Sequence, residues 1–344
     1  MTVTLRSFAK INLGLRIGAS RDDGFHDLLT VYQTIGLHDV IRISVGRGKG
    51  IEIRCEDPRV PRDESNTCYR VVEKAMQALQ AKGRAVVEIE KRLPVQGGMG
   101  GASSNAVAVL LGLERVLNKS LAAEERLRIA AEVGSDLPLF LAGGTVLGVG
   151  RGEQVYGLED LPAMACVVVT PEVGVSTAKA FAEWDRSSAD SQGLKPGLSE
   201  TVDAALKGRS PTTGLTLTTP KSSDRMSELG RGLSAWLSAS YSGAPRSRRG
   251  RAENPLLELV RAGIKNDFER VVFPEYPELS EGKRALERAG AKYASLSGSG
   301  STLYGLFASK NATRTAALKL CKQGWSAQAT VTLTRREYWK RLFR

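Results

Sequence analysis

Histidine and cysteine are scarce in this chain of 344 residues, which contains two histidines and four cysteines. His26 and His38 are too few for a zinc site built from histidine and cysteine, and no Ser-His-Asp arrangement stands out around them. The cysteines stand singly, without a C-x-x-C pair, and we interpret them as structural thiols. The composition therefore argues against zinc catalysis and against a serine hydrolase.

Long apolar runs are also missing, since none reaches the roughly 20 residues that a membrane helix needs. The first ten residues alternate like a strand and lack the apolar segment of a signal peptide. We therefore expect a cytoplasmic protein without a membrane partner. Its 42% hydrophobic and 25% charged residues are ordinary for a globular chain, and its length favours two domains.

The net charge of +12 has two interpretations, attraction of anionic ligands such as nucleotides and diphosphates, or binding of nucleic acid. Much of the excess is local, at residues 246–251 and 335–344. Such runs usually form solvated surface, so the charge alone does not choose between the two interpretations.

The hydrophobic pattern predicts a β-rich first third, with strands at 2–7, 12–17, 30–36, 39–45 and 50–54. Helices are predicted from Asn66 as N-cap, after Ser103 or Ser104 as N-cap, and over 122–133 up to Gly134. Further strands are predicted at 85–90, 144–149, 164–170, 293–297, 302–308 and 327–333, and further helices at 176–184, 255–270, 278–289 and 311–322.

The later elements have a β-α-β-β-α-β order, which indicates a split, ferredoxin-like second domain. We place the two domains at residues 1–160 and 161–344. Residues 185–253 are rich in Ser, Gly, Pro, Thr and Arg, so we predict an inserted mobile segment there, with one helix near 224–238.

A glycine-rich segment follows the strand at 85–90 and is the most informative stretch. It consists of Pro94, Val95, Gln96, Gly97, Gly98, Met99, Gly100, Gly101, Ala102, Ser103 and Ser104. Four glycines in five positions let a backbone approach an anion closely, and the free N–H groups of the following helix favour phosphate. The segment lacks the Gly-Lys-[Ser/Thr] ending of a Walker A loop and the third glycine of a dinucleotide fingerprint. A tight strand-to-helix turn is the alternative interpretation.

Three other motifs accompany this segment: FAKINL at 8–13 with DGFH at 23–26, GSDLPLF at 134–140, and LSGSGST at 296–302. Together with the glycine-rich segment, they resemble the motifs of the GHMP kinase superfamily, named for galactokinase, homoserine, mevalonate and phosphomevalonate kinases. The combination is most similar to the branch that phosphorylates a cytidine diphosphate alcohol in the non-mevalonate isoprenoid pathway. The likeness covers about residues 1–184 and 254–330.

This resemblance implies an α+β, two-domain GHMP kinase fold with a ribosomal-protein-S5-domain-2-like N-terminal half and a ferredoxin-like C-terminal half. It implies transfer of the γ-phosphoryl group of ATP, with Mg²⁺, to the 2-hydroxyl of that alcohol. By position, Asp136 resembles the catalytic base and Lys10 its partner. A carboxylate accepts the hydroxyl proton, and a neighbouring lysine holds that carboxylate ionised and offsets phosphoryl charge.

The resemblance also implies the binding residues. For ATP these are Asn66 and the segment from Pro94 to Ser104, with Ser104 as the expected Mg²⁺ ligand. For the alcohol they are Asn12, Phe25, His26, Thr177, Phe181, Gly298, Ser299 and Gly300. Phe25 and Phe181 resemble the pair that sandwiches the cytosine, although the family usually has Tyr at position 25 and Gly at positions 96 and 102.

Each motif has a simpler interpretation when it is taken alone. Lys10 is then a surface lysine, Asp136 an N-terminal helix residue, Asn66 a helix cap, and both phenylalanines core residues. A homoserine- or mevalonate-type kinase remains an alternative, as does a basic RNA-binding protein. The preferred interpretation expects a small-molecule substrate and ATP as partners, no nucleic acid, and a monomer or homodimer.

Overall fold

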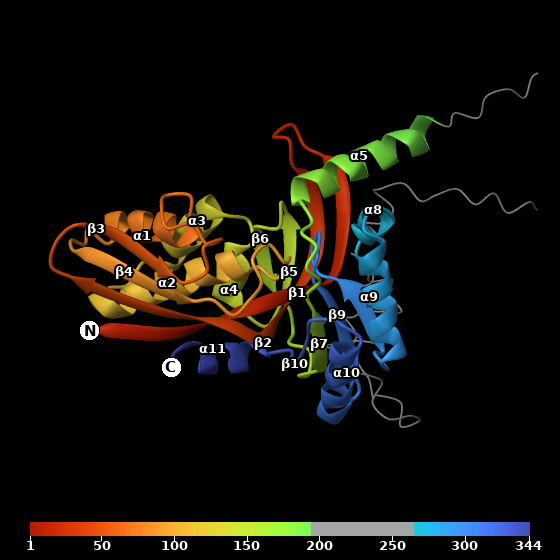
Figure 1. The fold of residues 1–344 in the computed structure, drawn as a ribbon. Helices are drawn as coiled ribbons and strands as arrows, with labels where there is room; N and C mark the ends of the chain where they lie inside the picture. The colour runs from red at the N-terminus through yellow and green to blue at the C-terminus, as the bar shows by residue number, and fades with distance from the viewer. Residues whose placement is uncertain (194–264) are drawn as a thin grey trace, which may run out of the picture.

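The computed structural model describes residues 1–193 and 265–344, which form two β-sheets joined by two long strands (Figure 1). Helices cover one face of the larger sheet, and both chain ends lie at the far end of this half (Figure 1). Among the described residues, no helix has the length and apolar character needed to cross a bilayer.

The larger sheet has six strands in the order β3-β4-β2-β5-β6, with β1 paired to β2. Its strands are β1 (Thr2–Ser20), β2 (His26–Gly46), β3 (Gly50–Cys55), β4 (Arg84–Glu90), β5 (Thr145–Gly150) and β6 (Gln154–Gly157). The predicted strands at 2–7 and 12–17 are one strand, and so are those at 30–36 and 39–45. Register shifts between Phe8 and Lys10 and between Asn12 and Gly14 interrupt the alternation without ending the pairing.

In the described part of the chain, the helices on the face of this sheet that carries the glycine-rich segment are α1 (Thr67–Ala78), α2 (Gly101–Leu117), α3 (Ala123–Val133) and α4 (Leu137–Ala142). The predicted caps at Asn66 and Gly134 are confirmed, because Asn66 accepts a hydrogen bond from the Cys68 N–H and Gly134 is the C-cap of α3. The prediction that Ser103 or Ser104 caps α2 is wrong. The N-cap is Gly100 in the left-handed conformation, which starts the helix earlier and places both serines inside its first turn.

The smaller sheet contains β7 (Ala165–Val169), β8 (Tyr293–Leu296), β9 (Leu303–Phe307) and β10 (Ala327–Val331). All neighbours are antiparallel in the order β10-β7-β9-β8, which is the arrangement of a split β-α-β-β-α-β unit and confirms the ferredoxin-like prediction. The helices of this half are α5 (Thr177–Gly193), α8 (Glu269–Glu275), α9 (Pro277–Arg288) and α10 (Lys310–Lys322).

The predicted insertion at 185–253 begins inside α5, which continues to Gly193 instead of ending at 184. The remainder of that segment lies outside the described residues, as do the predicted helix at 224–238, the arginines at 246–251 and the first part of the helix at 255–270. The predicted domain division at residue 160 stays a prediction.

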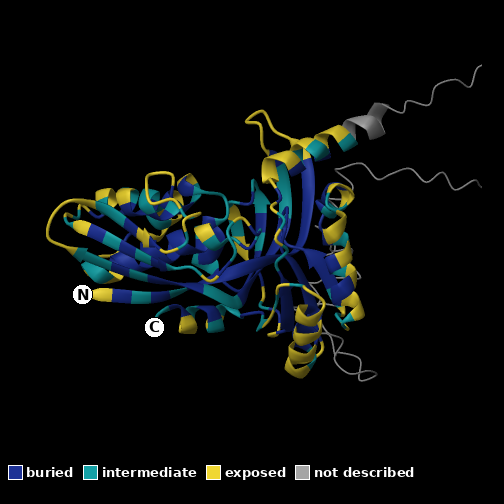
Figure 2. Cartoon of the chain, in the orientation of Figure 1, coloured by how far each residue is buried: buried dark blue, intermediate teal, exposed yellow. Residues whose placement is uncertain are grey.

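Three apolar clusters form the core, and β1 contributes to each of them: Leu5 to the first, Ile17 to the second and Ile11 to the one between them. Buried residues therefore run continuously along the central strands, while the outward faces of the helices are exposed (Figure 2).

The basic C-terminal run was expected to be solvated surface, and Arg336, Lys340, Arg341 and Arg344 are exposed. The run also forms helix α11 (Arg335–Leu342), whose apolar side packs on the first cluster. Tyr338 and Leu342 are buried there. The Arg335 guanidinium donates to the carbonyls of Thr145 and Leu158, so this cation is structural. The end of the chain thus returns to the N-terminal half.

Candidate active site

The glycine-rich segment connects β4 to α2 and packs against two other parts of the chain. The Lys10 N–H donates to the Met99 carbonyl at 3.0 Å, which ties the segment to β1. Gly100 has a φ of 67°, and a Cβ there would lie 2.9 Å from Phe140 Cζ and 3.1 Å from Lys10 Cγ. Glycine is thus required because Lys10 and α4 press directly on the loop.

Gly98 brings the second glycine-serine turn into contact with the same loop. Its φ is 73°, and a Cβ would collide with the carbonyl oxygens of Ser297 and Gly300. Ser297 Oγ donates to the Gly98 carbonyl at 3.1 Å, and the Thr302 N–H donates to the Gly97 carbonyl at 3.2 Å. The two turns, which are far apart in the sequence, therefore form one unit.

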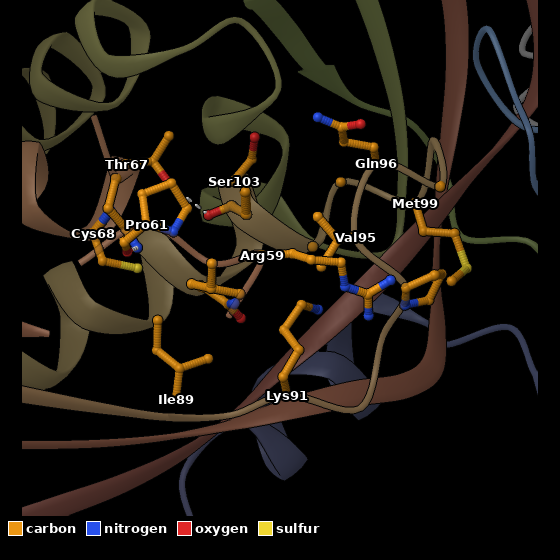
Figure 3. Close-up of a pocket in the computed structure, with 18 of the residues that line it drawn as sticks. Arg59, Pro61, Thr67, Cys68, Ile89, Lys91, Val95, Gln96, Met99 and Ser103 are labelled. Carbon is orange, nitrogen blue, oxygen red and sulfur yellow. Dashed lines mark hydrogen bonds between the residues drawn. The ribbon is translucent and has the colours of Figure 1, made fainter. Parts of the chain in front are cut away.

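A pocket of about 290 Å³ opens beside this loop (Figure 3). Every residue from Pro94 to Ser103 lines it, together with Asn66, Cys68, Arg59 and Lys91. The Arg59 and Lys91 side chains both extend into it (Figure 3). The N-terminus of α2 makes the pocket suitable for an anion. The two cations already have carboxylate partners, Asp57 at 2.7 Å for Arg59 and Asp39 at 2.8 Å for Lys91.

Asn66 lines this pocket and also caps α1. Its side chain accepts from the Cys68 N–H at 2.8 Å and donates to the Pro61 carbonyl at 2.6 Å. The simpler interpretation of Asn66 as a cap is thus present in the structure beside its place in the pocket.

Asp39 was not predicted from the sequence, and its carboxylate holds the glycine-rich loop in place. This fully buried carboxylate accepts from the N–H groups of Arg92 and Leu93 at 2.7 Å each, from Lys91 Nζ at 2.8 Å and from Asn105 Nδ2 at 3.0 Å. It therefore joins both ends of the glycine-rich segment. A lone Asp within a strand does not indicate this role in the sequence. The Lys91-Arg92 pair directly before the loop is the pattern that indicates a carboxylate partner at this place.

Lys10 and Asp136 meet beside the loop, with Lys10 Nζ 3.5 Å from Asp136 Oδ2. Lys10 is buried in β1 and Asp136 is the N-cap residue of α4. Lys10 Nζ also donates to Asn12 Oδ1 at 2.7 Å, and Asn12 Nδ2 donates to Thr30 Oγ1 at 2.8 Å. The interpretation of Lys10 as a surface lysine is wrong, because its side chain is buried. The partners described here are what a buried ammonium needs.

The second glycine turn completes this side of the site. A Cβ at Gly298 would lie 3.5 Å from Asn12 Oδ1 and 3.6 Å from Lys10 Nζ. Ser299 Oγ and Thr177 Oγ1, at the start of α5, share a hydrogen bond of 2.8 Å. Four predicted alcohol-binding residues, including Asn12, therefore form a continuous chain of contacts.

The predicted cytosine pair, Phe25 and Phe181, and the neighbouring alcohol-binding residue His26 are arranged differently from a ready-made sandwich. Phe181 stacks on the His26 ring, with centroids 4.9 Å apart and planes 10° apart. His26 Nε2 lies 2.7 Å from Asp185 Oδ1. Phe25 is half exposed, and the guanidinium of Arg151 lies 5.0 Å from its ring centroid. The structure thus pairs Phe181 with His26 and leaves the face of Phe25 to Arg151.

Ser103 and Ser104 differ in their surroundings. Ser103 is partly exposed and lines the pocket, whereas Ser104 is buried and its Oγ accepts from Ser7 Oγ at 2.7 Å. Within residues 1–193 and 265–344, no group of three or more His, Cys, Asp and Glu residues is placed to hold a metal ion.

Comparison with known proteins agrees with this geometry. Residues 66–144 match the family described as GHMP kinases N terminal domain, and residues 252–324 match GHMP kinases C terminal. A homoserine kinase structure from Cytophaga hutchinsonii, 18% identical, has the same fold, with a TM-score of 0.65 over 97% of this chain and 95% of that one. Fold and site together define a small-molecule kinase of the GHMP class.

Similarity to individual proteins is more specific. The 4-diphosphocytidyl-2-C-methyl-D-erythritol kinase of Solibacter usitatus is 36% identical over 90% of this chain and 82% of that protein, and the one of Geobacter sulfurreducens is 32% identical over 96% and 99%. A crystal structure of 4-(cytidine 5'-diphospho)-2C-methyl-D-erythritol kinase, 25% identical, superposes with a TM-score of 0.68 over 96% and 98%. The chain belongs to the 4-diphosphocytidyl-2-C-methyl-D-erythritol kinase family.

Proposed function

We propose that this protein transfers the γ-phosphoryl group of ATP to the 2-hydroxyl of 4-diphosphocytidyl-2-C-methyl-D-erythritol, in the non-mevalonate route to isoprenoid precursors. The observation that carries the proposal is the meeting of Lys10 and Asp136, 3.5 Å apart, at the glycine-rich loop. The relatives named above carry this activity in their names. We also propose that the protein acts in the cytoplasm, as a monomer or homodimer.

Asp136 is the proposed general base. The substrate oxygen forms a bond to the γ-phosphorus, the bond from that phosphorus to the β–γ bridging oxygen breaks, and ADP leaves. The hydroxyl proton moves to Asp136. A tertiary alcohol is a weak nucleophile, so a well-placed carboxylate accelerates this step by roughly 10²–10⁴-fold. The side chain of Asp136 is about one-third exposed, which leaves it accessible to a substrate.

Lys10 and the loop supply the electrostatic part of the proposal. The ammonium is buried, so its charge acts over a short range with little screening by water. It stabilises the Asp136 carboxylate and offsets the negative charge that builds on the transferring group. Most of the acceleration in phosphoryl transfer comes from such positioning and charge neutralisation.

ATP is assigned to the pocket beside the loop, with its phosphates at the N-terminus of α2. Asn105 Oδ1, buried under this pocket, has no hydrogen-bond partner in the described part of the chain, which fits a pocket that receives a polar ligand. Mg²⁺ bound to the phosphates neutralises their charge. Ser104 was the expected hydroxyl ligand, and Ser103, which faces the pocket, is the other hydroxyl that can hold this ion.

The alcohol is assigned to the surface beyond Lys10. Asn12 and the turn of Gly298, Ser299 and Gly300 lie next to the reacting group, and Thr177 marks the start of α5. Farther along, we assign Phe25, His26 and Phe181 to the cytosine, with each phenylalanine using the ring face that His26 or Arg151 does not cover. Base stacking contributes about 1–3 kcal/mol per ring.

ATP consumption measured across candidate alcohols, with and without the cytidine diphosphate group, tests the proposal. We expect turnover with the cytidine diphosphate alcohol alone. Preference for homoserine or mevalonate derivatives would assign the chain a different GHMP activity. Tight RNA binding that weakens steeply with salt, without turnover, would favour the nucleic-acid alternative.

A further inference from the structure

Tyr32 contacts both members of the proposed catalytic pair, although it belongs to none of the motifs. It lies in β2, opposite Asn12 of β1, and is only 3% exposed. Its hydroxyl donates to Asp136 Oδ1 at 3.2 Å, and Lys10 Nζ lies 5.4 Å from its ring centroid. Lys10 approaches the other carboxylate oxygen, Oδ2, at 3.5 Å. The two oxygens of Asp136 therefore have different partners.

The neighbouring strand leaves room for this tyrosine through two glycines. A Cβ at Gly148 in β5 would lie 2.5 Å from Tyr32 Cε2, and a Cβ at Gly152 in the following turn would lie 2.5 Å from the Tyr32 hydroxyl. A larger residue at either position collides with the tyrosine, so the side chain of Tyr32 must shift from its place. The backbone of this region is thus built around the Tyr32 hydroxyl in its contact with Asp136.

We propose that Tyr32 is a positioning residue for phosphoryl transfer, which holds Asp136 Oδ1 so that Oδ2, beside Lys10, is the oxygen that takes the substrate proton. This inference rests on the proposed function of Asp136 as base. In the step, the substrate O–H bond breaks, its proton binds Oδ2, and the Tyr32 hydroxyl keeps its own proton. The tyrosine fixes the direction of the acceptor lone pair and does not exchange protons.

The charged groups around Tyr32 agree with a role as a pure donor. Asp136 at α4 accepts from its hydroxyl, Lys10 of β1 lies over its ring, and Glu153 of the β5–β6 turn, which is paired with Arg151, adds a second negative charge nearby. Burial first, and then the negative charge of Asp136, raise the pKa of Tyr32 well above its usual range. The hydroxyl therefore stays protonated wherever the enzyme works and can only donate to the carboxylate.

Replacing Tyr32 with Phe tests the inference, because the ring remains and only the hydroxyl is lost. We expect kcat to fall about 10-fold and KM for ATP to stay within about twofold of the original value. KM for the alcohol should also stay within about twofold, so that the loss is confined to turnover, as expected for a residue that only directs the base. Gly148→Ala, which keeps the hydroxyl but displaces the ring, should lower kcat in the same way.

Tyr338→Phe is the matched control, because this buried hydroxyl donates to the Phe140 backbone carbonyl and not to Asp136. It should keep the original kcat. An unchanged kcat in Tyr32→Phe, or an equal loss of kcat in Tyr338→Phe, would overturn the inference. If Asp136→Asn is inactive while Tyr32→Phe is normal, only the role of Tyr32 falls; if Asp136→Asn is active, the proposed base falls as well.

Discussion

Lys10 is buried next to the partly exposed carboxylate of Asp136, and the partners of the Lys10 ammonium explain why a buried charge is stable there. Desolvation of the Lys10 ammonium is offset by Asn12 at 2.7 Å and by Asp136 at 3.5 Å. Asn12 is itself oriented by Thr30, which donates to the Gly14 carbonyl. The charge is therefore fixed in position before any substrate arrives, and no reorganisation is needed during transfer.

Asp136→Asn should preserve the fold and nucleotide binding but reduce turnover by about 10²-fold or more, because an amide cannot accept the hydroxyl proton. Single-turnover kinetics and ATP titration together measure the two effects. Rates near those of the original protein would remove Asp136 from the chemistry. Equal losses of ATP affinity and turnover would indicate a structural role instead.

Phe25→Ala should raise KM for the cytidine substrate about 5-fold or more, from the loss of one stacked ring, and leave KM for ATP unchanged. The side chain is 50% exposed, so the fold should tolerate the change. Tyr156→Ala, which removes an aromatic residue of similar exposure from β6, is the control. Equal effects on both substrates would reject the assignment of Phe25 to the cytosine.

At the scale of elements, the connection from β4 to α2 depends on one carboxylate. Asp39 holds the two backbone N–H groups before the glycines and the Asn105 amide after them. Four donors on one buried carboxylate leave the entry and exit of the loop little freedom. Gly98 and Gly100 can then adopt left-handed conformations while the ends of the loop stay fixed.

Asp39→Asn should raise KM for ATP about 10-fold or more while changing KM for the alcohol little. The reason is that Lys91 Nζ and Asn105 Nδ2, which both donate to Asp39 Oδ2, lose their acceptor at the ATP pocket. A stability loss of roughly 1–3 kcal/mol should accompany it. Asp160→Asn is the control, since this carboxylate also holds two backbone N–H groups, those of Thr145 and Arg335, outside the pocket. If both variants change KM for ATP equally, Asp39 has no particular role at the loop.

Strand β6 and helices α4 and α11 were missed because their patterns are weak over a short length. Helix α4 has six residues that are almost all apolar, so it has no amphipathic period to detect. Helix α11 is dominated by basic residues, and only Tyr338 and Leu342 are buried in it. Its capping box, Thr334 with Glu337, was present in the sequence and would have indicated its start.

At the scale of the molecule, β1 and β2 join the two halves. Leu5 and Ile43 pack in the first cluster, Leu15 and Ile17 in the second, and both strands contribute to the cluster between them. The site lies where these strands pass between the two sheets, with Lys10 and Asn12 on β1. Residues from both halves can therefore act on one substrate.

The free energy of unfolding should decrease as the pH rises above about 9. Burial raises the pKa values of Cys68 and Tyr293 to about 12, and those of Cys166, Tyr304 and Tyr338 are also raised. In the unfolded chain these groups ionise near 8.5 for Cys and 10 for Tyr. Their contribution is thus complete below those values and is lost as the pH rises toward the folded-state pKa.

Urea unfolding at a series of pH values between 7 and 11 measures this decrease. Cys68→Ala should reduce its slope above pH 9, because one raised group has been removed. Constant or increasing stability over the same range would contradict the prediction.

The sequence by itself determined the class of this protein, because glycines and serines at defined spacing can be read locally and their order is specific to one superfamily. It also determined the ferredoxin-like order of the second half, through hydrophobic periodicity. Only the tertiary structure decided which side chains meet: Tyr32 and Asp39 stand in strands where nothing nearby in the chain marks them. Their partners lie 104 and up to 66 positions away, and contacts between such distant residues are set by how β2 packs against α4 and α2.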